Sequence, residues 1–554
     1  MKEIFNAVFK ELGYDNDTRI IKSNKDADFQ CDDLFKLAKL YHKAPKEIGE
    51  EVVNKINNID DFDKYFKEVS FANPGFINIK VSDYYICEEL RRLMKKEVFG
   101  ADKESKTIVL DYGGPNVAKP LHVGHLRSAI LGQAINNILK FVGNNTIADV
   151  HLGDIGTQMG QVIYGILNDF ENPETAEFDL EYLNKTYPKI SSLCKENEEI
   201  KAECLKITKD LQNGNVLYKK LWQRIHDLSI SDIKSIYNYL DVHFDYWYGE
   251  SDSYKEFDKL FSIFEKEDVL KEDDGAKVIF VKEESDKIEV PPCLIQKSDG
   301  AYLYATADLG TILQRESDFK PDNMIYITDN RQNMHFIQVF RAARKCKLTT
   351  ANLEHYGFGT VNGTDNKPFK TRSGGTMKLQ DLINEVRTEF ISLREENKSM
   401  NDEDVDKIIN AIIKFADMQN DLEHNYIFDI KKFSEVNGKT GPYILYTYLR
   451  INKIISDNNG VLSDKIYSET DRNLRLKLLE VSDTINTAAR DRKPHYIANY
   501  LYDLSVSANN FYQNNRVLGL EGTQKNDFEI ILNFNNKIIE TLLKLLGINI
   551  PEKM

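Results

Sequence analysis

The spacing of apolar and polar residues divides this chain of 554 residues into three regions. Between about residues 101 and 384, short apolar runs at 107–112, 277–281 and 324–328 alternate with stretches in which apolar residues recur every three to four positions. This alternation predicts strands and helices in turn. We therefore expect an α/β domain built on a parallel sheet, with ligands bound at the carboxyl ends of its strands.

The two flanking regions follow other patterns. Residues 1–100 combine helical spacing at 34–41 with a strand-like run at 76–81, which predicts a small α/β accessory domain. From 385 to 554 the strand signals fade, and segments such as 531–545 repeat at helical spacing. This last region is therefore predicted to be all-helical, and its composition alone would fit a helical dimerisation bundle equally well.

A polar stretch with helical spacing, residues 171–220, interrupts the α/β region. We interpret it as part of an insertion, over about 171–250, that divides the α/β domain into two halves. No chemistry can be predicted from the residues of this stretch.

Composition excludes several classes of protein. No run of 18 apolar residues occurs, so no membrane span is expected, and the N-terminus lacks the apolar stretch of a secretory signal. The six cysteines form no CxxC pair, which argues against a zinc or redox site and fits a protein of the reducing cytoplasm. The net charge of −15 argues against a non-specific coat on nucleic acid, but it leaves a shape-specific RNA binder open.

The segment PNVAKPLHVGH, Pro115–His125, carries the clearest chemical signal. It follows the strand-like run 107–112 and opens a helical stretch over 122–142, and the N-terminus of a helix favours phosphate groups. An HxGH sequence alone is more often a pair of surface histidines, but the order of strand, loop and helix predicts a nucleotide site. The residues suited to a nucleotide are Lys119, His122, Gly124 and His125.

The same segment resembles a known family. His122–His125 resembles the HIGH motif of class I aminoacyl-tRNA synthetases, and PNVAKPLHVGHLRS resembles the arginyl-tRNA synthetases in particular. Six further segments of that family follow in its order over nearly the whole chain: GDIGTQMG, LYATADLG, RQNMHF, KPFKTRSGGTMKL, GPYILYTYLR and FYQNNRVLG. The HIGH region comprises Pro115, Asn116, Val117, Ala118, Lys119, Pro120, Leu121, His122, Val123, Gly124 and His125.

The resemblance implies an α/β multidomain fold. Residues 101–384 would form a Rossmann-like, parallel-sheet catalytic domain with its helical insertion. Residues 1–100 would form an N-terminal α/β accessory domain that contacts tRNA, and residues 385–554 a C-terminal all-helical domain that binds the anticodon.

The predicted amino-acid pocket can be argued from chemistry. Arginine presents a planar, permanently charged guanidinium, which needs carboxylates placed to accept its fork of donors. Asp308 lies four residues after Tyr304, so the two share one face if the segment is helical, and Asp111 ends the strand before the HIGH loop. Without the family, Asp308 would more often be a capping or surface acid, and Tyr304 a core residue. The resemblance implies that arginine contacts Asp111, Asn116, His125, Tyr304, Asp308 and Gln332.

The predicted ATP site departs from the class pattern. The usual KMSKS loop is replaced by KPFKTRSGG, residues 367–375, in which Lys370 and Arg372 supply positive charge. In relatives with this degenerate loop, a lysine just before HIGH substitutes, and Lys119 holds that position. Two neutral changes, Gly114 for serine and Ile155 for tryptophan, do not argue against activity. The implied catalytic residues are Lys119, His122, His125, Lys370 and Arg372, with Lys119, His122, Gly124, His125 and Lys370 binding ATP.

The resemblance implies a ligase that joins L-arginine to tRNA(Arg) in two steps. Arginine and ATP, with Mg²⁺, would form arginyl-adenylate, and the terminal ribose 2′-OH of tRNA would then accept the arginyl group. We expect activation to depend on bound tRNA, and we expect a cytoplasmic monomer without a protein-bound metal. The alternatives are a non-catalytic paralogue that binds tRNA or a partner, and a class I enzyme for another amino acid.

Overall fold

The computed structural model describes residues 1–23, 27–298, 300–369, 377–393, 400–456, 458 and 460–554. The chain forms two compact units, each treated separately below. The first contains Met1–Ala101, Thr447–Thr484 and Tyr502–Ile539, and the second contains Asp102–Tyr446, Ile485–Leu501 and Glu540–Met554.

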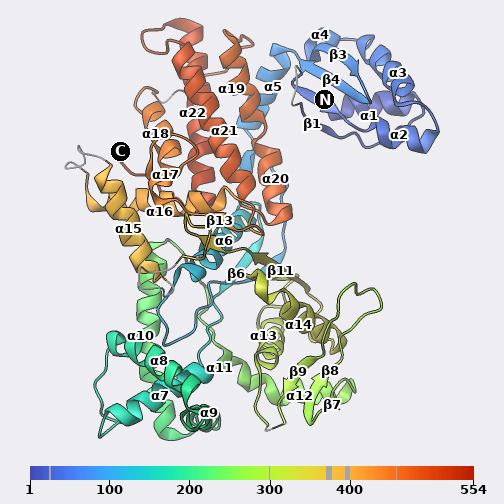
Figure 1. Ribbon diagram of the computed structural model, residues 1–554. Helices are drawn as coiled ribbons and strands as arrows, with labels where there is room; N and C mark the ends of the chain where they lie inside the picture. Colours follow the sequence, from blue (N-terminus) through green and yellow to red (C-terminus); the bar gives the residue numbers. More distant parts are fainter. Residues whose placement is uncertain (24–26, 299, 370–376, 394–399, 457, 459) are drawn as a thin grey trace. The chain divides into compact units, whose positions relative to one another are not determined.

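The second unit contains a four-stranded parallel sheet, of which β6 and β11 are labelled in Figure 1. Its order is β11-β10-β5-β6, and every neighbouring pair is parallel. The strands are β5 (Thr107–Tyr112), β6 (Asn145–Asp149), β10 (Asn323–Asp329) and β11 (Asn352–Phe358). The parallel sheet predicted from the apolar runs at 107–112 and 324–328 is therefore confirmed.

Three helices pack on this sheet: α6 (Val123–Phe141), α13 (Tyr304–Phe319) and α14 (Asn333–Lys345). Val109 of β5 and Tyr326 of β10 share a buried core with Leu309 of α13. Because side chains alternate along a strand, Asp111 points to the same face as Val109 and reaches α13. The alternation along β5 thus explains how a buried acid comes to lie under that helix.

The predicted insertion is helical. Residues 171–250 contain α8 (Leu180–Glu196), α9 (Glu198–Gln212) and α10 (Val216–Tyr239), drawn in green in Figure 1, and α7 (Thr157–Asp169) precedes them. The chain continues through α11 (Glu250–Ser253), the 3-10 turn η2 (Tyr254–Glu256) and α12 (Phe257–Lys266).

The run at 277–281 does not belong to the parallel sheet, and that part of the sequence interpretation was wrong. It forms β8 (Ala276–Ile279) in a separate antiparallel sheet with β7 (Lys271–Asp273) and β9 (Cys293–Gln296). The reason is the tight turn at Asp274 and Gly275, whose φ angles are 45° and 77°. A two-residue turn of this kind joins antiparallel strands, whereas parallel strands need a long crossover.

In the described part of the region after residue 385, the regular elements are helices with one exception. Its helices are α15 (Leu379–Ser392), α16 (Asp402–Met418), α17 (Ile430–Ser434), α18 (Gly441–Asn452), α19 (Glu469–Leu479), α20 (Val481–Asp491), α21 (His495–Asn514) and α22 (Gly522–Leu545). The expectation of no strands after 385 is corrected by β13 (Tyr426–Ile427), which pairs with β12 (Val361–Asn362). Each of these strands has only two residues, which is too short for an alternating pattern that would predict a strand from the sequence. Helix α22 confirms the helical spacing at 531–545.

In the first unit, an antiparallel sheet of order β1-β2-β4-β3 is formed by β1 (Ile20–Lys22), β2 (Phe29–Cys31), β3 (Phe66–Ala72) and β4 (Phe76–Val81). Around it lie α1 (Lys2–Glu11), α2 (Leu34–Tyr41), α3 (Pro45–Asn57), α4 (Phe62–Tyr65), α5 (Asp83–Met94) and the 3-10 turn η1 (Glu97–Gly100). The predicted helix at 34–41 and strand at 76–81 are confirmed. Arg472 of α19 binds both carboxylate oxygens of Asp28 at 2.7 Å, so this helix is tied to the sheet within the unit.

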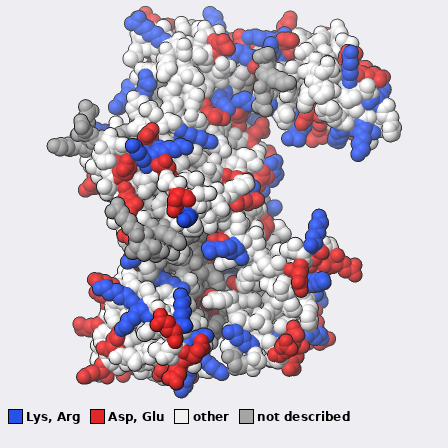
Figure 2. Space-filling model, in the orientation of Figure 1, with Lys and Arg blue, Asp and Glu red and all other residues white. Residues whose placement is uncertain are grey.

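No helix in the described part of the chain is both long and apolar enough to cross a membrane. On the face shown in Figure 2, basic and acidic side chains are interspersed.

Candidate functional site

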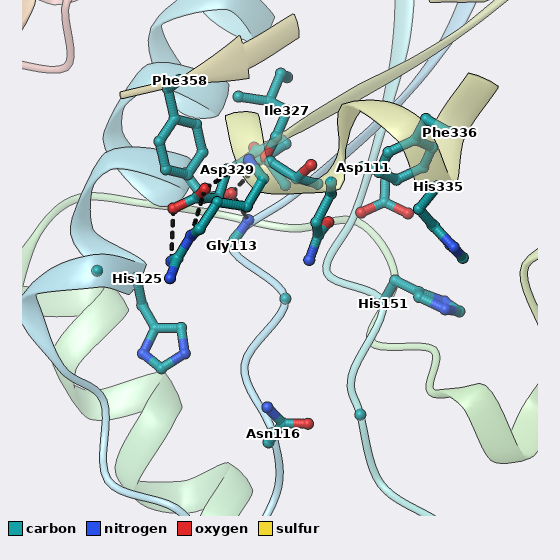
Figure 3. A pocket seen from close by; sticks show the side chains of 18 of the residues that line it. Asp111, Gly113, Asn116, His125, His151, Ile327, Asp329, His335, Phe336 and Phe358 are labelled. Carbon is teal, nitrogen blue, oxygen red and sulfur yellow. Dashed lines mark hydrogen bonds and ion pairs between the residues drawn. The ribbon is translucent and has the colours of Figure 1, made fainter. Parts of the chain in front are cut away.

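A cavity of about 450 Å³ opens at the carboxyl end of the parallel sheet. All four strands contribute, because Asp111, His151, Asp329 and Phe358 follow or end β5, β6, β10 and β11. His125 lies on one side of the cavity, and His151 and His335 lie on the other (Figure 3). This is the position at which parallel α/β sheets bind ligands.

The HIGH histidines cap helix α6. His122 Nδ1 accepts a hydrogen bond from the N–H of Gly124 at 3.1 Å, and His125 Nδ1 accepts one from the N–H of His122 at 3.1 Å. The two rings stack with centroids 3.8 Å apart. Since each Nδ1 is an acceptor, each neutral ring carries its proton on Nε2 and is a donor there.

The pKa values of both histidines are depressed. Burial, together with the nearby charge of Lys119, lowers the pKa of His122. Burial first, and then His122 and Lys119, lowers the pKa of His125 to about 3. At neutral pH both rings are therefore uncharged hydrogen-bond donors, so that Lys119 is the cation of this segment.

Asp308 and Tyr304 lie one turn apart on α13, and both line the cavity. Tyr304 is 57% exposed, so it is a cavity residue and not part of the core. Asp308 Oδ2 lies 2.6 Å from His335 Nε2, and Asp308 Oδ1 lies 3.9 Å from His151 Nε2. The Asp308 carboxylate is thus held in place by His335 of α14. Burial alone would lower the pKa of His335, but the hydrogen bond and the charge of Asp308 raise it.

Asp111 also lines the cavity, but its carboxylate already has a partner. Arg315 Nη2 of α13 donates to Asp111 Oδ2 at 2.7 Å and to Asp149 Oδ2 at 2.6 Å, and Arg315 is 1% exposed. Burial raises the pKa of Asp111, and the Arg315 guanidinium offsets part of that increase. Sequence reasoning placed Asp111 at the cavity but could not detect this internal ion pair.

Glu250, at the start of α11, is a further acid at the cavity besides Asp111, Asp308 and Asp329, and sequence reasoning missed it. Its N–H donates to Leu152 O at 2.9 Å, and the next residue, Ser251, donates its N–H to Asp154 Oδ1 at 3.0 Å. Burial, followed by the charges of Asp308 and Asp154, raises the pKa of Glu250 to about 8. No motif in the sequence surrounds Glu250, but Asp154, which holds this turn, belongs to the GDIGTQ segment.

The other predicted residues fall in different places. Asn116 and Gln332 line the cavity, as does Gly124. Lys119 does not line it, and its Nζ lies 4.6 Å from the ring centroid of Tyr187 in the insertion. Lys370 and Arg372 lie outside the described residues. The apolar members of the HIGH region, Val117, Ala118, Leu121 and Val123, are buried.

A second cavity of about 270 Å³ adjoins the first. Both are lined by His122, Gly124, Asp329, Arg331 and Phe358. The second cavity is also lined by two short segments, residues 359–361 and 368–369. The two cavities therefore have His122 and Gly124 of the HIGH segment as a common wall.

Gly114 cannot be replaced by serine without a shift of the backbone. A Cβ atom at this position would lie 2.6 Å from His151 O and 2.8 Å from Val150 O. The glycine is therefore matched to the close approach of the loop that follows β6. Among the described residues, no group of three or more His, Cys, Asp or Glu side chains is arranged to hold a metal ion.

Comparison with known families accounts for nearly the whole chain. Residues 89–430 match the model for the catalytic domain of class I tRNA synthetases (R), and residues 444–554 match the DALR anticodon binding domain. Residues 1–81 match the arginyl tRNA synthetase N terminal domain.

Curated proteins and solved structures agree with these matches. The chain is 38% identical to an arginine–tRNA ligase of Alkaliphilus oremlandii over 99% of this chain and 98% of that protein. It is 37% identical to one of Agathobacter rectalis over the full length of both. The crystal structure of arginyl-tRNA synthetase from Plasmodium falciparum is 26% identical and superposes with a TM-score of 0.82 over 100% of this chain and 98% of that one. The Thermus thermophilus structure, at 20% identity and TM-score 0.83 over 100% and 99%, shares the fold.

Proposed function

This chain belongs to the arginyl-tRNA synthetases, and we propose that the cavity at the end of its parallel sheet is where arginine reacts with ATP. The chain is an arginine–tRNA ligase: it charges tRNA with arginine and uses ATP as a substrate. The observation that carries the proposed site is that two acidic side chains, Asp308 and Glu250, line one cavity together with the HIGH histidines.

The guanidinium of arginine binds between Asp308 and Glu250. A planar fork of donors pairs best with carboxylate oxygens, and the Tyr304 ring beside them offers a face on which a guanidinium can stack. The Asp111 carboxylate is fixed by its ion pair with Arg315. It can therefore accept hydrogen bonds from arginine only through the lone pairs that Arg315 does not use. Asn116 and Gln332 contact the amino and carboxylate ends of the substrate.

ATP binds across the N-terminus of α6, in the second cavity. The first N–H groups of a helix and its dipole favour phosphate there. His122 and His125 donate from Nε2 as neutral groups, while Lys119, with Lys370, Arg372 and the Mg²⁺ that accompanies ATP, supplies the positive charge.

In the first step, a carboxylate oxygen of arginine attacks the α-phosphorus of ATP. The new P–O bond gives arginyl-adenylate, and the bond to the β-phosphate oxygen breaks and releases pyrophosphate. No protein nucleophile is needed, so catalysis consists of alignment and stabilisation of phosphate charge. In the second step, the 2′-OH of the tRNA terminal ribose attacks the adenylate carbonyl and releases AMP.

Arginine is selected against lysine by geometry. A lysine ammonium is a point charge with three donors, and it cannot pair with two separated carboxylates as a guanidinium fork does. Buried acceptors left unpaired by the wrong substrate cost binding energy, so no editing site is required.

The remaining assignments rest on the family. Residues 1–100 contact tRNA, residues 101–384 catalyse the reaction, and residues 385–554 bind the anticodon of tRNA(Arg). The protein acts as a monomer in the cytoplasm, and its activation step depends on bound tRNA.

The test is aminoacylation of total tRNA with ATP and, separately, arginine, lysine, glutamate and cysteine, by wild type and Asp308→Ala. Charging with arginine alone, largely lost in the variant, is expected. No charging with any of the four by a folded protein would overturn the proposal and favour a non-catalytic paralogue or another amino acid.

A further inference from the structure

Lys119 is held by the helical insertion. Its Nζ lies 4.6 Å from the ring centroid of Tyr187 on α8, and among the described residues no carboxylate is paired with it. A ring face attracts an ammonium without cancelling its net charge, whereas a carboxylate would neutralise it. The Tyr187 ring therefore orients Lys119 and leaves its charge available for a phosphate.

The backbone before Lys119 is held by the same insertion. Ala118 adopts a left-handed conformation with φ of 65° and is 2% exposed. Its N–H donates to Ser229 Oγ of α10 at 3.1 Å. Ser229 Oγ in turn donates to Ile225 O at 2.8 Å, one turn earlier on α10. A residue with a side chain keeps this strained conformation only where its surroundings impose it.

Lys119 lies three residues before His122, at the start of the segment that caps α6. After burial, which is the larger cause, its charge also lowers the pKa of both His122 and His125. The insertion thus touches the segment twice, once through a ring on α8 and once through a hydroxyl on α10.

We propose that Tyr187 and Ser229 are positioning residues for ATP: through them, the helical insertion holds the Lys119 ammonium beside the HIGH histidines. The inference rests on the proposed role of Lys119 toward ATP. It gives a function to the polar insertion, from whose sequence no chemistry could be predicted.

Tyr187→Leu removes the ring, Tyr187→Phe keeps it, and Tyr182→Leu is a matched control on the same helix, because Tyr182 packs against Phe170 and Phe178 instead. We measure pyrophosphate exchange with saturating tRNA and arginine. Tyr187→Leu is expected to lower kcat/KM for ATP about two- to thirty-fold, as the loss of a cation–π contact does. Tyr187→Phe and Tyr182→Leu should stay within about two-fold, and the KM for arginine should not change.

A double-mutant cycle separates positioning from folding. If Tyr187 acts through Lys119, Tyr187→Leu has no further effect in a Lys119→Met background. An equal loss in both backgrounds, or no loss in the wild-type background, would overturn the proposal. Ser229→Ala should lower the same parameter, and Ala118→Gly added to it should restore activity, because glycine adopts the left-handed conformation freely.

Equilibrium binding of ATP to the same variants gives a readout that does not need turnover. Weaker binding to Tyr187→Leu than to Tyr182→Leu supports the placement of Lys119, and equal binding contradicts it. An inactive wild type that still shows this difference would count against the proposed ligase site, not against the role of Tyr187.

Discussion

Replacement of Glu250 by glutamine should remove the contribution of this side chain to the pH dependence of arginine binding between pH 7 and 9. The pKa of Glu250 is about 8, raised first by burial and then by the charges of Asp308 and Asp154. At pH 7 only about one carboxyl group in ten is ionised, and ionising it costs about 1.4 kcal/mol. At pH 9 that cost almost vanishes.

The direction of this pH dependence follows from the positive charge of arginine. A guanidinium stabilises the ionised acid, so a proton leaves when arginine binds, and affinity increases with pH until Glu250 is already ionised. The KM for arginine of the wild type should fall about fivefold from pH 7 to 8 and about tenfold from pH 7 to 9. Glu250→Gln cannot titrate, so its KM should be higher and should lack this change; at pH 9 the loss of a charge-assisted hydrogen bond raises it about tenfold or more.

The assay is tRNA charging at saturating ATP, with the KM for arginine measured at pH 7, 8 and 9. The α-amino group of arginine also titrates in this range, so the ratio of variant to wild type is the informative quantity. Glu256→Gln, an acid-to-amide change in the adjacent turn η2 and outside the cavity lining, is the matched control and should follow the wild type. Parallel profiles for wild type and Glu250→Gln would refute the reasoning.

Three further outcomes are expected. Arg315→Met leaves two buried aspartates unpaired and should lower the free energy of unfolding by about 3–5 kcal/mol in a denaturant titration; a loss below about 1 kcal/mol would contradict the buried ion pair. Gly114→Ser forces a Cβ to within 2.6 Å of His151 O and should cost about 1–3 kcal/mol in the same assay, whereas unchanged stability would show that the loop yields freely. Pyrophosphate exchange should be slow without tRNA and fast with it; full exchange without tRNA would contradict the predicted dependence.

The sequence was sufficient to predict those parts of the fold whose elements are adjacent along the chain. The strand at 107–112, the loop and helix α6 follow one another along the chain, so their order alone indicates a helix N-terminus facing the ligand. Tyr304 and Asp308 are likewise one turn apart, and helical spacing predicts that they share a face.

Pairings between distant segments could not be predicted. The partner of Asp111 is Arg315, 204 residues later, so the sequence showed a free acid where the structure has an ion pair. Glu250 reaches the cavity because the segment after β6 pairs with the segment before α11, with Leu152 O accepting from the Glu250 N–H. No motif surrounds Glu250, so only the fold reveals it.

The depressed pKa values of the HIGH histidines depend in the same way on burial that no pattern shows. The pKa of His125 falls to about 3 because the assembled site removes the ring from water. A reading of residue types alone counts such a histidine as a potential cation, and the structure makes it a neutral donor.

Inhibition of arginine charging by citrulline tests the central claim most directly. Citrulline has nearly the shape of arginine but carries a neutral urea in place of the guanidinium. If Asp308 and Glu250 recognise the charged fork, the inhibition constant of citrulline should exceed the KM for arginine by at least about a hundred-fold. An inhibition constant within about tenfold of that KM would contradict recognition by carboxylates in this cavity.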